Sequence, residues 1–323
     1  MDWLYAILGA TGGVVFLALT VSFICFIRVF YSRNARRELR EGEYEIPDGE
    51  VYRPFVDVMI EWVKMTRALK HERFEIKSDD GLTLRAKYYE CDPDGPIEIM
   101  FHGYRGSAER DLSGGVERCF ALGRNAFIVH QRASIGSDGH VITFGIKEHR
   151  DCVRWCEFVS EHFGKKRELI LTGISMGAAT VTMASSEKLP ENVRCILADC
   201  GYTSPEEIIK KVIRDMKLPP KLLYPFVRLG AIIFGGFDPN AKSSTEALRH
   251  TKIPVIFIHG DNDDFVPADM SRSLYDACQS KKALVFIEGA GHGLAYPVNK
   301  EKYLTALREF EAVWREDNAA AKK

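Results

Sequence analysis

The chain has 323 residues, which suffice for one large α/β domain with a buried core or for two smaller domains. Its 44 basic and 45 acidic side chains nearly cancel to a net charge of −1. The protein therefore lacks a strong field, and nucleic acid is not expected as a partner. The eight cysteines form no Cys-x-x-Cys pair and no cluster with histidine, so no metal site is expected.

A long apolar run begins after Asp2. Residues 3–27 contain no charged side chain, and at a rise of about 1.5 Å per residue a helix of this length crosses a bilayer. The acidic start and the length of the run argue against a cleaved signal peptide. We therefore expect residues 1–31 to form a single transmembrane anchor, with a buried N-terminal helix as the alternative.

Basic residues follow this run and none precedes it. By the positive-inside rule, this asymmetry places the rest of the chain in the cytoplasm. Several unpaired thiols agree with that compartment. The basic residues are Arg28, Arg33, Arg36, Arg37 and Arg40.

Residues 32–71 are expected to form a polar linker and then an amphipathic helix. Between Pro54 and Leu69 the apolar residues recur at nearly helical spacing. The polar face of this helix mixes acidic and basic side chains rather than being purely basic. We therefore expect it to pack on the following domain, with a position on the membrane surface as the alternative.

Residues 72–318 have the pattern of an α/β domain. Two β-rich runs, 74–77 and 82–89, flank an Asp80-Gly81 pair that favours a tight hairpin turn, so an antiparallel edge is expected. Further apolar runs alternate with helical stretches and predict a doubly wound, mostly parallel sheet. These runs are 97–101, 126–130, 168–172, 195–198, 255–259 and 284–287.

The interval 202–248 interrupts this alternation. It contains no expected strand but has helical stretches at 205–216 and 221–234, and the second stretch is strongly apolar. We therefore expect a small helical cap inserted into the sheet at 202–248. The Ala/Lys-rich residues 319–323 are expected to be a disordered tail.

The motif Gly173-Ile174-Ser175-Met176-Gly177 joins an apolar strand to small residues that begin a helix. A serine at the tip of a sharp strand-to-helix turn needs strained backbone angles. Glycine at both flanking positions lets the neighbouring strand and helix approach closely. This setting predicts that Ser175 is a nucleophile.

A serine hydroxyl is a weak nucleophile unless a base removes its proton, so a histidine and an acid are expected later in the chain. His292 lies in a glycine-rich loop after the run 284–287 and is the expected base. Asp263 follows the run 255–259 and is the expected acid; both loops lie where parallel sheets place their sites. The alternatives for the acid are Asp261, Asp264 and Asp199.

Acyl transfer also requires main-chain N–H donors for the oxyanion. One is expected from Met176, directly after the nucleophile, and another from Tyr104, in the loop after the run 97–101. His102 is expected to be a structural hydrogen-bonding residue in that loop. Arg132 and Asp138 are expected to hold a nearby loop by ion pairing.

These motifs resemble the α/β-hydrolase superfamily over about residues 73–315. Within it, the chain resembles a group of bacterial hydrolases related to serine aminopeptidases, esterases and dienelactone hydrolases. The resemblance implies the Ser–Asp–His triad named above and no cofactor. Its N-terminal anchor departs from many relatives with the same core. The segments that carry this resemblance are 102–104, 131–139 and 143–145, with Glu148, Asp151 and Trp155.

We therefore expect a membrane-anchored serine hydrolase that cleaves a carboxylic ester through an acyl-enzyme. The apolar cap and the anchor favour a small, lipid-derived ester as the partner. A peptidase or amidase is the first alternative, in which Glu206, Glu207 and Asp215 of the cap would hold a substrate ammonium group. A non-catalytic scaffold that retains the fold is the second.

Overall fold

An eight-stranded sheet lies at the centre of the molecule, in the order β1-β2-β4-β3-β5-β6-β7-β8. This computed structural model describes residues 2–33 and 42–320. β1 pairs with β2, and β2 with β4, in antiparallel fashion, and the other neighbours are parallel. The strands are β1 (Glu72–Lys77), β2 (Thr83–Tyr89), β3 (Ile97–Phe101), β4 (Asn125–His130), β5 (Leu169–Ile174), β6 (Val193–Asp199), β7 (Val255–Gly260) and β8 (Lys282–Ile287).

The expected mostly parallel sheet with an antiparallel N-terminal edge is therefore confirmed. Each strand agrees with its apolar run to within two residues at either end. The agreement follows from burial: β3 and β7 are buried at every residue, as strands covered on both faces must be. β1 is half-exposed, as an edge strand can be.

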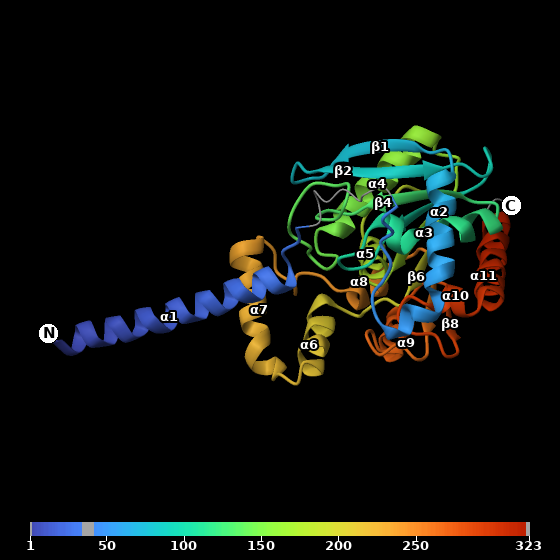
Figure 1. Ribbon diagram of the computed structural model, residues 1–323. Helices are drawn as coiled ribbons and strands as arrows, with labels where there is room; N and C mark the ends of the chain where they lie inside the picture. Colours follow the sequence, from blue (N-terminus) through green and yellow to red (C-terminus); the bar gives the residue numbers. More distant parts are fainter. Residues whose placement is uncertain (1, 34–41, 321–323) are drawn as a thin grey trace.

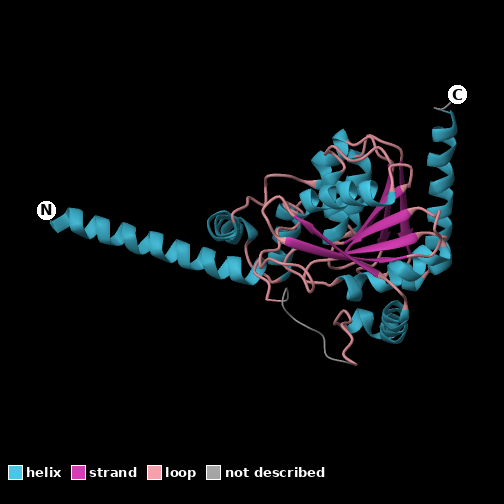
Figure 2. Ribbon diagram, turned by 90° about the horizontal axis from the view of Figure 1, so that it is seen from above, coloured by secondary structure: helices cyan, strands magenta, loops and turns pink. Residues whose placement is uncertain are grey.

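Helices cover both faces of the sheet (Figures 1 and 2). One face packs against α4 (Glu148–Phe163), α5 (Met176–Ala184), α8 (Ser244–His250) and α9 (Ala268–Ala277). The other packs against α2 (Val56–Ala68), α3 (Ala108–Ala121), α10 (Ala295–Val298) and α11 (Lys300–Ala320). α11 includes positions 319 and 320, whereas the rest of the expected tail, 321–323, lies outside the described residues.

The amphipathic segment forms α2, which follows a short 3-10 helix, η2 (Glu50–Phe55). α2 packs on α3, and a Cβ atom built on Gly114 of α3 would lie 2.7 Å from the ring of Trp62. Met59, Trp62 and Val63 are buried in this contact. This helix therefore covers its apolar side by packing against the domain, as expected, and not by lying on a membrane surface.

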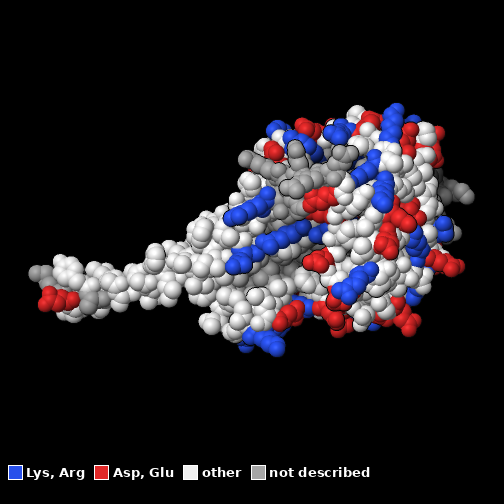
Figure 3. Space-filling view, viewed as in Figure 1, with Lys and Arg blue, Asp and Glu red and all other residues white. Residues whose placement is uncertain are grey.

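The N-terminal run forms α1 (Asp2–Val29), which projects from the body (Figure 1). It is long and apolar enough to cross a membrane. In Figure 3 the charged side chains gather on the α/β body, whereas the projecting part is almost entirely white. Among the described side chains of α1, those of Ser22 and Phe26 near its end are buried, and Phe30, which follows the helix, is buried as well. Three of the basic residues used to predict its orientation, at positions 36, 37 and 40, lie outside the described residues.

Two helices, α6 (Pro205–Asp215) and α7 (Pro220–Gly235), follow β6 and stand apart from the sheet. α7 packs against the end of α1. The expected cap interval 202–248 also includes most of α8, which sequence patterning missed. α8 packs on α5 and α9 and so belongs to the body of the domain.

Candidate active site

Ser175 lies at a sharp turn between β5 and α5. Its φ angle is 56°, in the left-handed region that L-residues rarely adopt. A Cβ atom on Gly173 would lie 2.0 Å from the carbonyl carbon of Gly177, and one on Gly177 would lie 2.0 Å from the carbonyl oxygen of Phe101. Only glycine fits at these two positions, so the strained turn is held by close backbone packing.

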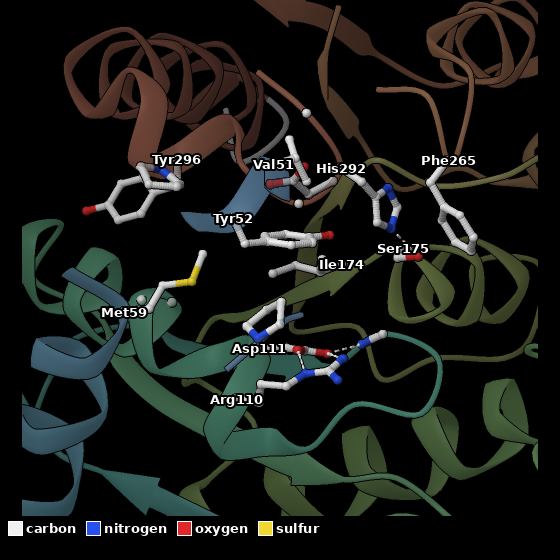
Figure 4. Close-up of a pocket in the computed structure, with 18 of the residues that line it drawn as sticks. Val51, Tyr52, Met59, Arg110, Asp111, Ile174, Ser175, Phe265, His292 and Tyr296 are labelled. Carbon is white, nitrogen blue, oxygen red and sulfur yellow. Dashed lines mark hydrogen bonds and ion pairs between the residues drawn. The ribbon is translucent and has the colours of Figure 1, made fainter. Parts of the chain in front are cut away.

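Three side chains from separate loops meet at this turn. His292, in the loop after β8, has Nε2 3.0 Å from Ser175 Oγ. Its Nδ1 lies 2.7 Å from Oδ2 of Asp263, in the loop after β7. If Nδ1 carries the proton, it donates to the carboxylate, and Nε2 accepts from the serine hydroxyl. Figure 4 shows His292 facing Ser175, with the ring of Phe265 packed 5.0 Å from the imidazole.

The Asp263 carboxylate is completely buried but well supplied with donors. Its Oδ1 accepts from the main-chain N–H groups of Phe265 at 2.9 Å and Val266 at 2.8 Å. Burial alone would raise the pKa of Asp263, but hydrogen bonds from His259 and His292 hold it well below its usual range. Asp263 therefore stays ionised at neutral pH and can stabilise a protonated His292.

His259, the second histidine at this carboxylate, was not predicted. It is fully buried at the end of β7, with Nε2 2.8 Å from the Val266 carbonyl oxygen and 3.1 Å from Asp263 Oδ2. Its Nδ1 lies 2.6 Å from Ser271 Oγ. The available signal was a polar residue at the end of the apolar run 255–259, where burial requires it to find partners.

The three alternative acids occupy other roles. Asp261 Oδ1 accepts from the Gly289 N–H at 2.7 Å and so ties the loops after β7 and β8 together. Asp199, at the end of β6, accepts from the Tyr303 hydroxyl at 2.8 Å. Asp264 is exposed, and its carbonyl oxygen binds Lys211. Only Asp263 of these four reaches His292.

The two expected oxyanion donors flank Ser175. Met176 is the first residue of α5, so its N–H is one of those that have no acceptor within the helix. Tyr104 lies in the loop after β3, beside Gly103, whose Cβ position would lie 3.6 Å from Ser175 Cβ. The Gly103 N–H donates to the buried Asp111 carboxylate at 2.9 Å, which fixes this loop.

Hydrogen bonds also tie this loop to the end of α1. The Tyr104 hydroxyl donates to the Val29 carbonyl oxygen at 2.6 Å. Arg105 Nη2 donates to the carbonyl oxygens of Arg28 at 2.8 Å and Tyr31 at 3.2 Å. The expected structural role of His102 also fits its contacts, because its Nε2 accepts from the Gln131 N–H at 3.1 Å.

Known proteins resemble this chain over the region that contains Ser175, Asp263 and His292. Residues 169–300 match the serine hydrolase (FSH1) family, and this segment includes the serine, aspartate and histidine above. The YqkD protein of Bacillus subtilis is 25% identical over 190 residues, which span 58% of this chain and 62% of YqkD. The bem46 protein of Schizosaccharomyces pombe is 27% identical over 221 residues, 66% of this chain and 68% of bem46.

Solved structures share its architecture. The Pyrococcus furiosus esterase Pf2001 superposes with a TM-score of 0.62 at 22% identity, over 77% of this chain and 93% of the esterase. The Butyrivibrio proteoclasticus protein Est1E, with ferulic acid bound, gives a TM-score of 0.58 at 19% identity, over 75% of this chain and 99% of Est1E. The chain therefore has the α/β-hydrolase fold. The expected fold class is thereby confirmed.

A cavity of about 490 Å³ opens beside Ser175 in this α/β-hydrolase fold. Its wall includes the N-terminal segment that sequence patterning placed outside the domain: Val51, Tyr52, Met59 and Trp62 line it together with Ile174, Phe265 and Tyr296. Figure 4 shows Tyr52 and Ile174 next to each other beside the Ser175–His292 pair. No described residue of 202–248 lines the cavity.

Arg132 and Asp138 of the 131–139 loop do not pair with each other. Arg132 donates to Asp151 at 2.6 Å and to Asp80 at 2.8 Å, because its side chain points toward α4 and the β1–β2 turn. Asp138 pairs with Arg85 at 3.5 Å. The contacts with Asp80 and Arg85 attach the loop to the antiparallel edge of the sheet, and the contact with Asp151 attaches it to α4.

Cys200, Asp263 and His292 place one potential metal ligand atom each within 4.8 Å of one another. Burial raises the pKa of the Cys200 thiol well above its ordinary value, whereas a metal binds the thiolate. The other two groups are hydrogen-bonded to each other. Their geometry therefore favours an acid–base pair over metal ligation.

Proposed function

We propose that this α/β hydrolase cleaves a carboxylic ester through an acyl-enzyme on Ser175. The observation that carries the proposal is the hydrogen-bonded series Ser175 Oγ, His292 Nε2, His292 Nδ1 and Asp263 Oδ2, with distances of 3.0 and 2.7 Å. His292 is the general base, and Asp263 orients and stabilises its protonated form. The N–H groups of Tyr104 and Met176 are the proposed oxyanion donors.

In the first half of the reaction, Ser175 Oγ attacks the ester carbonyl carbon while its proton passes to His292 Nε2. The bond from that carbon to the alcohol oxygen then breaks, and His292 returns the proton to the leaving alcohol. In the second half, His292 takes a proton from water, whose oxygen attacks the acyl carbon. The bond to Ser175 Oγ breaks, the serine recovers its proton, and a carboxylic acid leaves.

The cavity favours an ester with an apolar acyl group. The aliphatic and aromatic part of its wall can bury such a group, as small-molecule sites commonly do, while charged residues, among them the paired Arg110 and Asp111, line another part. The acids expected to hold an ammonium group in a peptidase are otherwise engaged: Glu206 pairs with Lys210 at 2.5 Å, and Asp215 with Lys211 at 2.7 Å. Neither acid lines the cavity.

The location of the protein is part of the same proposal. We place residues 2–21 of α1 across a bilayer, since they are apolar and stand clear of the body. The basic residues that follow put the catalytic body in the cytoplasm by the positive-inside rule. A lipid-derived ester can then reach the body from the membrane.

The decisive experiment is labelling of the full chain in detergent micelles with a fluorophosphonate probe. Wild type is compared with Ser175→Ala and His292→Ala. Ser273→Ala and His250→Ala are matched controls, because both residues are exposed and lie on helices away from the turn at Ser175. We expect labelling of wild type and both controls, and loss of labelling in the two site variants.

A series of p-nitrophenyl esters of increasing acyl length then tests the substrate class. We expect hydrolysis to require Ser175 and to favour apolar acyl groups over acetate. Labelling without turnover of any ester, together with cleavage of aminoacyl amides, would favour the amidase. Folded wild type that does not react with the probe would contradict the proposal and favour the scaffold.

A further inference from the structure

Helix α7 is apolar on two faces, and only one of them is covered. Tyr224, Val227 and Ala231 are buried against the protein. A second stripe of apolar residues recurs at helical spacing, at positions 222, 226, 229 and 233. The residues at its two ends, Leu222 and Ile233, are 67% and 49% exposed. A helix that is apolar all round is stable when both faces are covered. The second face therefore requires an apolar partner.

The position of α7 indicates what that partner is. α7 crosses α1 in close contact: a Cβ atom on Gly230 would lie 2.2 Å from the Ser22 carbonyl oxygen. Nearby, the rings of Phe23 and Phe234 meet edge to face at 5.1 Å. Figures 1 and 2 show that α7 runs across α1 rather than along it. If α1 spans a bilayer, α7 therefore lies along the plane of that bilayer.

The level of this crossing along α1 can be estimated. Residues 2–21 form a helix about 30 Å long, which equals the thickness of the hydrocarbon core. Among the α1 residues whose burial is described, Ser22 is the first buried one, so the crossing lies where the helix leaves the hydrocarbon. α7 is therefore held at the boundary between acyl chains and headgroups.

The turn between α6 and α7 also carries exposed apolar side chains. Met216 and Leu218 are 63% and 41% exposed there. The exposed Lys217 lies between them in the sequence, and the exposed Lys221 follows shortly after. Apolar side chains beside lysines suit an interface in which the former enter the acyl region and the latter meet anionic headgroups. In Figure 3 the white surface of α1 continues onto the region of α7, and charged side chains appear at its lower end.

We propose that the exposed stripe of α7, with Met216 and Leu218, is a second membrane contact of this protein. The bilayer covers the unpartnered face of α7, and α1 and α7 together set the orientation of the hydrolase body. This inference rests on the proposed membrane span of α1 and is independent of the proposed catalysis, because α7 lines no part of the cavity.

The test uses the full chain in nanodiscs of phosphatidylcholine and phosphatidylglycerol. The photoreactive residue p-benzoylphenylalanine replaces Ile233 or Leu222 in turn. Position 8 of α1, where Leu8 is 59% exposed, reports the membrane span. Position 154 of α4 is the matched control, because the Arg154 side chain is 51% exposed and α4 lies away from α1 and α7 in Figure 1. Lipid adducts are measured by mass spectrometry after irradiation.

We expect lipid adducts at positions 8, 222 and 233 and none at 154. Adducts at position 8 without adducts at 222 and 233 would overturn the α7 contact while leaving the span of α1 intact. Covalent dimers at 222 or 233 in place of lipid adducts would also overturn it, because a second copy of the chain would then cover the stripe. Absence of adducts at 8 as well would overturn the span and the inference together.

Discussion

The buried carboxylate of Asp263 organises the candidate site at the scale of single residues. It accepts from two main-chain N–H groups and lies between two imidazoles, so it is both rigid and ionised. Its rigidity fixes the ring orientation of His292 and leaves Nε2 facing the nucleophile. His259, which touches Asp263 but not Ser175, is a positioning residue.

Asp263→Asn is expected to lower kcat for an ester substrate by about 10³- to 10⁴-fold, because an amide can hold His292 in the wrong tautomer. KM should change little. Asp264→Asn is the matched control, since that neighbouring acid is exposed and does not reach the imidazole. Steady-state kinetics of the two variants provide the measurement. Equal effects at 263 and 264 would contradict the assignment of the acid.

A second buried carboxylate, Glu98 of β3, contributes to stability rather than to the site. It is completely buried and binds Arg118 and, at 2.9 Å, Arg124. Burial by itself would raise the pKa of Glu98, but the two arginines lower it to about 2. This folded-state pKa lies below the unfolded value of about 4.3. The ionised group therefore stabilises the fold above that pH, and the contribution is lost as pH falls from about 4.3 to 2.

Glu98→Gln is expected to destabilise the protein by about 3–5 kcal/mol at neutral pH, because the buried Arg118 loses its carboxylate partner and Arg124 keeps only its pair with Glu311. The variant should also lose part of the acid dependence of unfolding between about pH 4.3 and 2. Glu75→Gln removes an exposed pair with Arg85 and should change stability by less than about 1 kcal/mol. Urea unfolding in micelles as a function of pH tests both expectations. A Glu98→Gln curve parallel to wild type would contradict them.

At the scale of elements, close backbone contact joins α1 to α7. Gly230→Ala places a methyl group against the Ser22 carbonyl oxygen and is expected to destabilise the protein by about 1–3 kcal/mol. Gly12→Ala is the matched control on α1, because no atom lies within 4 Å of its Cβ position. That substitution should leave stability unchanged or slightly raise it. Thermal unfolding of the full chain compares the two, and equal Tm values would contradict the packing.

The 3-10 helix η2 acts as a wall of the cavity, although it precedes the hydrolase body in the sequence. Tyr52→Ala should enlarge the cavity and raise kcat/KM for long acyl esters relative to short ones. Tyr44→Ala is the control, because Tyr44 packs on Arg67 and does not line the cavity. The ester series supplies the measurement. An unchanged length preference in Tyr52→Ala would show that the acyl group binds elsewhere.

For the whole molecule, the end of α1 is part of the folded body and not a mere tether. The ring of Phe30 packs against Phe144 at 5.7 Å and Phe237 at 5.2 Å, and the loop of Tyr104 bonds to the main chain of Val29. The apolar helix α1 and the proposed oxyanion loop are therefore mechanically connected.

Two truncations separate the projecting part of α1 from the part that packs on the body. Removal of residues 2–21 leaves the contacts from Ser22 onward intact, so fluorophosphonate labelling should proceed at nearly the rate of the full chain. Removal of residues 2–31 takes away the ring of Phe30, which exposes Phe144 and Phe237, and it removes the main-chain partner of Tyr104. The Tm and the labelling rate should therefore both fall. Equal labelling rates for the two truncated proteins in detergent would show that the loop holds its geometry without α1.

The amino-acid sequence by itself determined the strands, the antiparallel edge, the turn at Ser175 and the candidate pair of Ser175 and His292. These features follow from short apolar runs, from helical hydrophobic patterns and from glycine at turns, all of which involve only a few neighbouring residues. Only the tertiary structure decided which aspartate reaches His292, that His259 supports it, and that Val51 and Tyr52 border the cavity. Such contacts join residues far apart in the chain, and their geometry arises from packing, which no local pattern records.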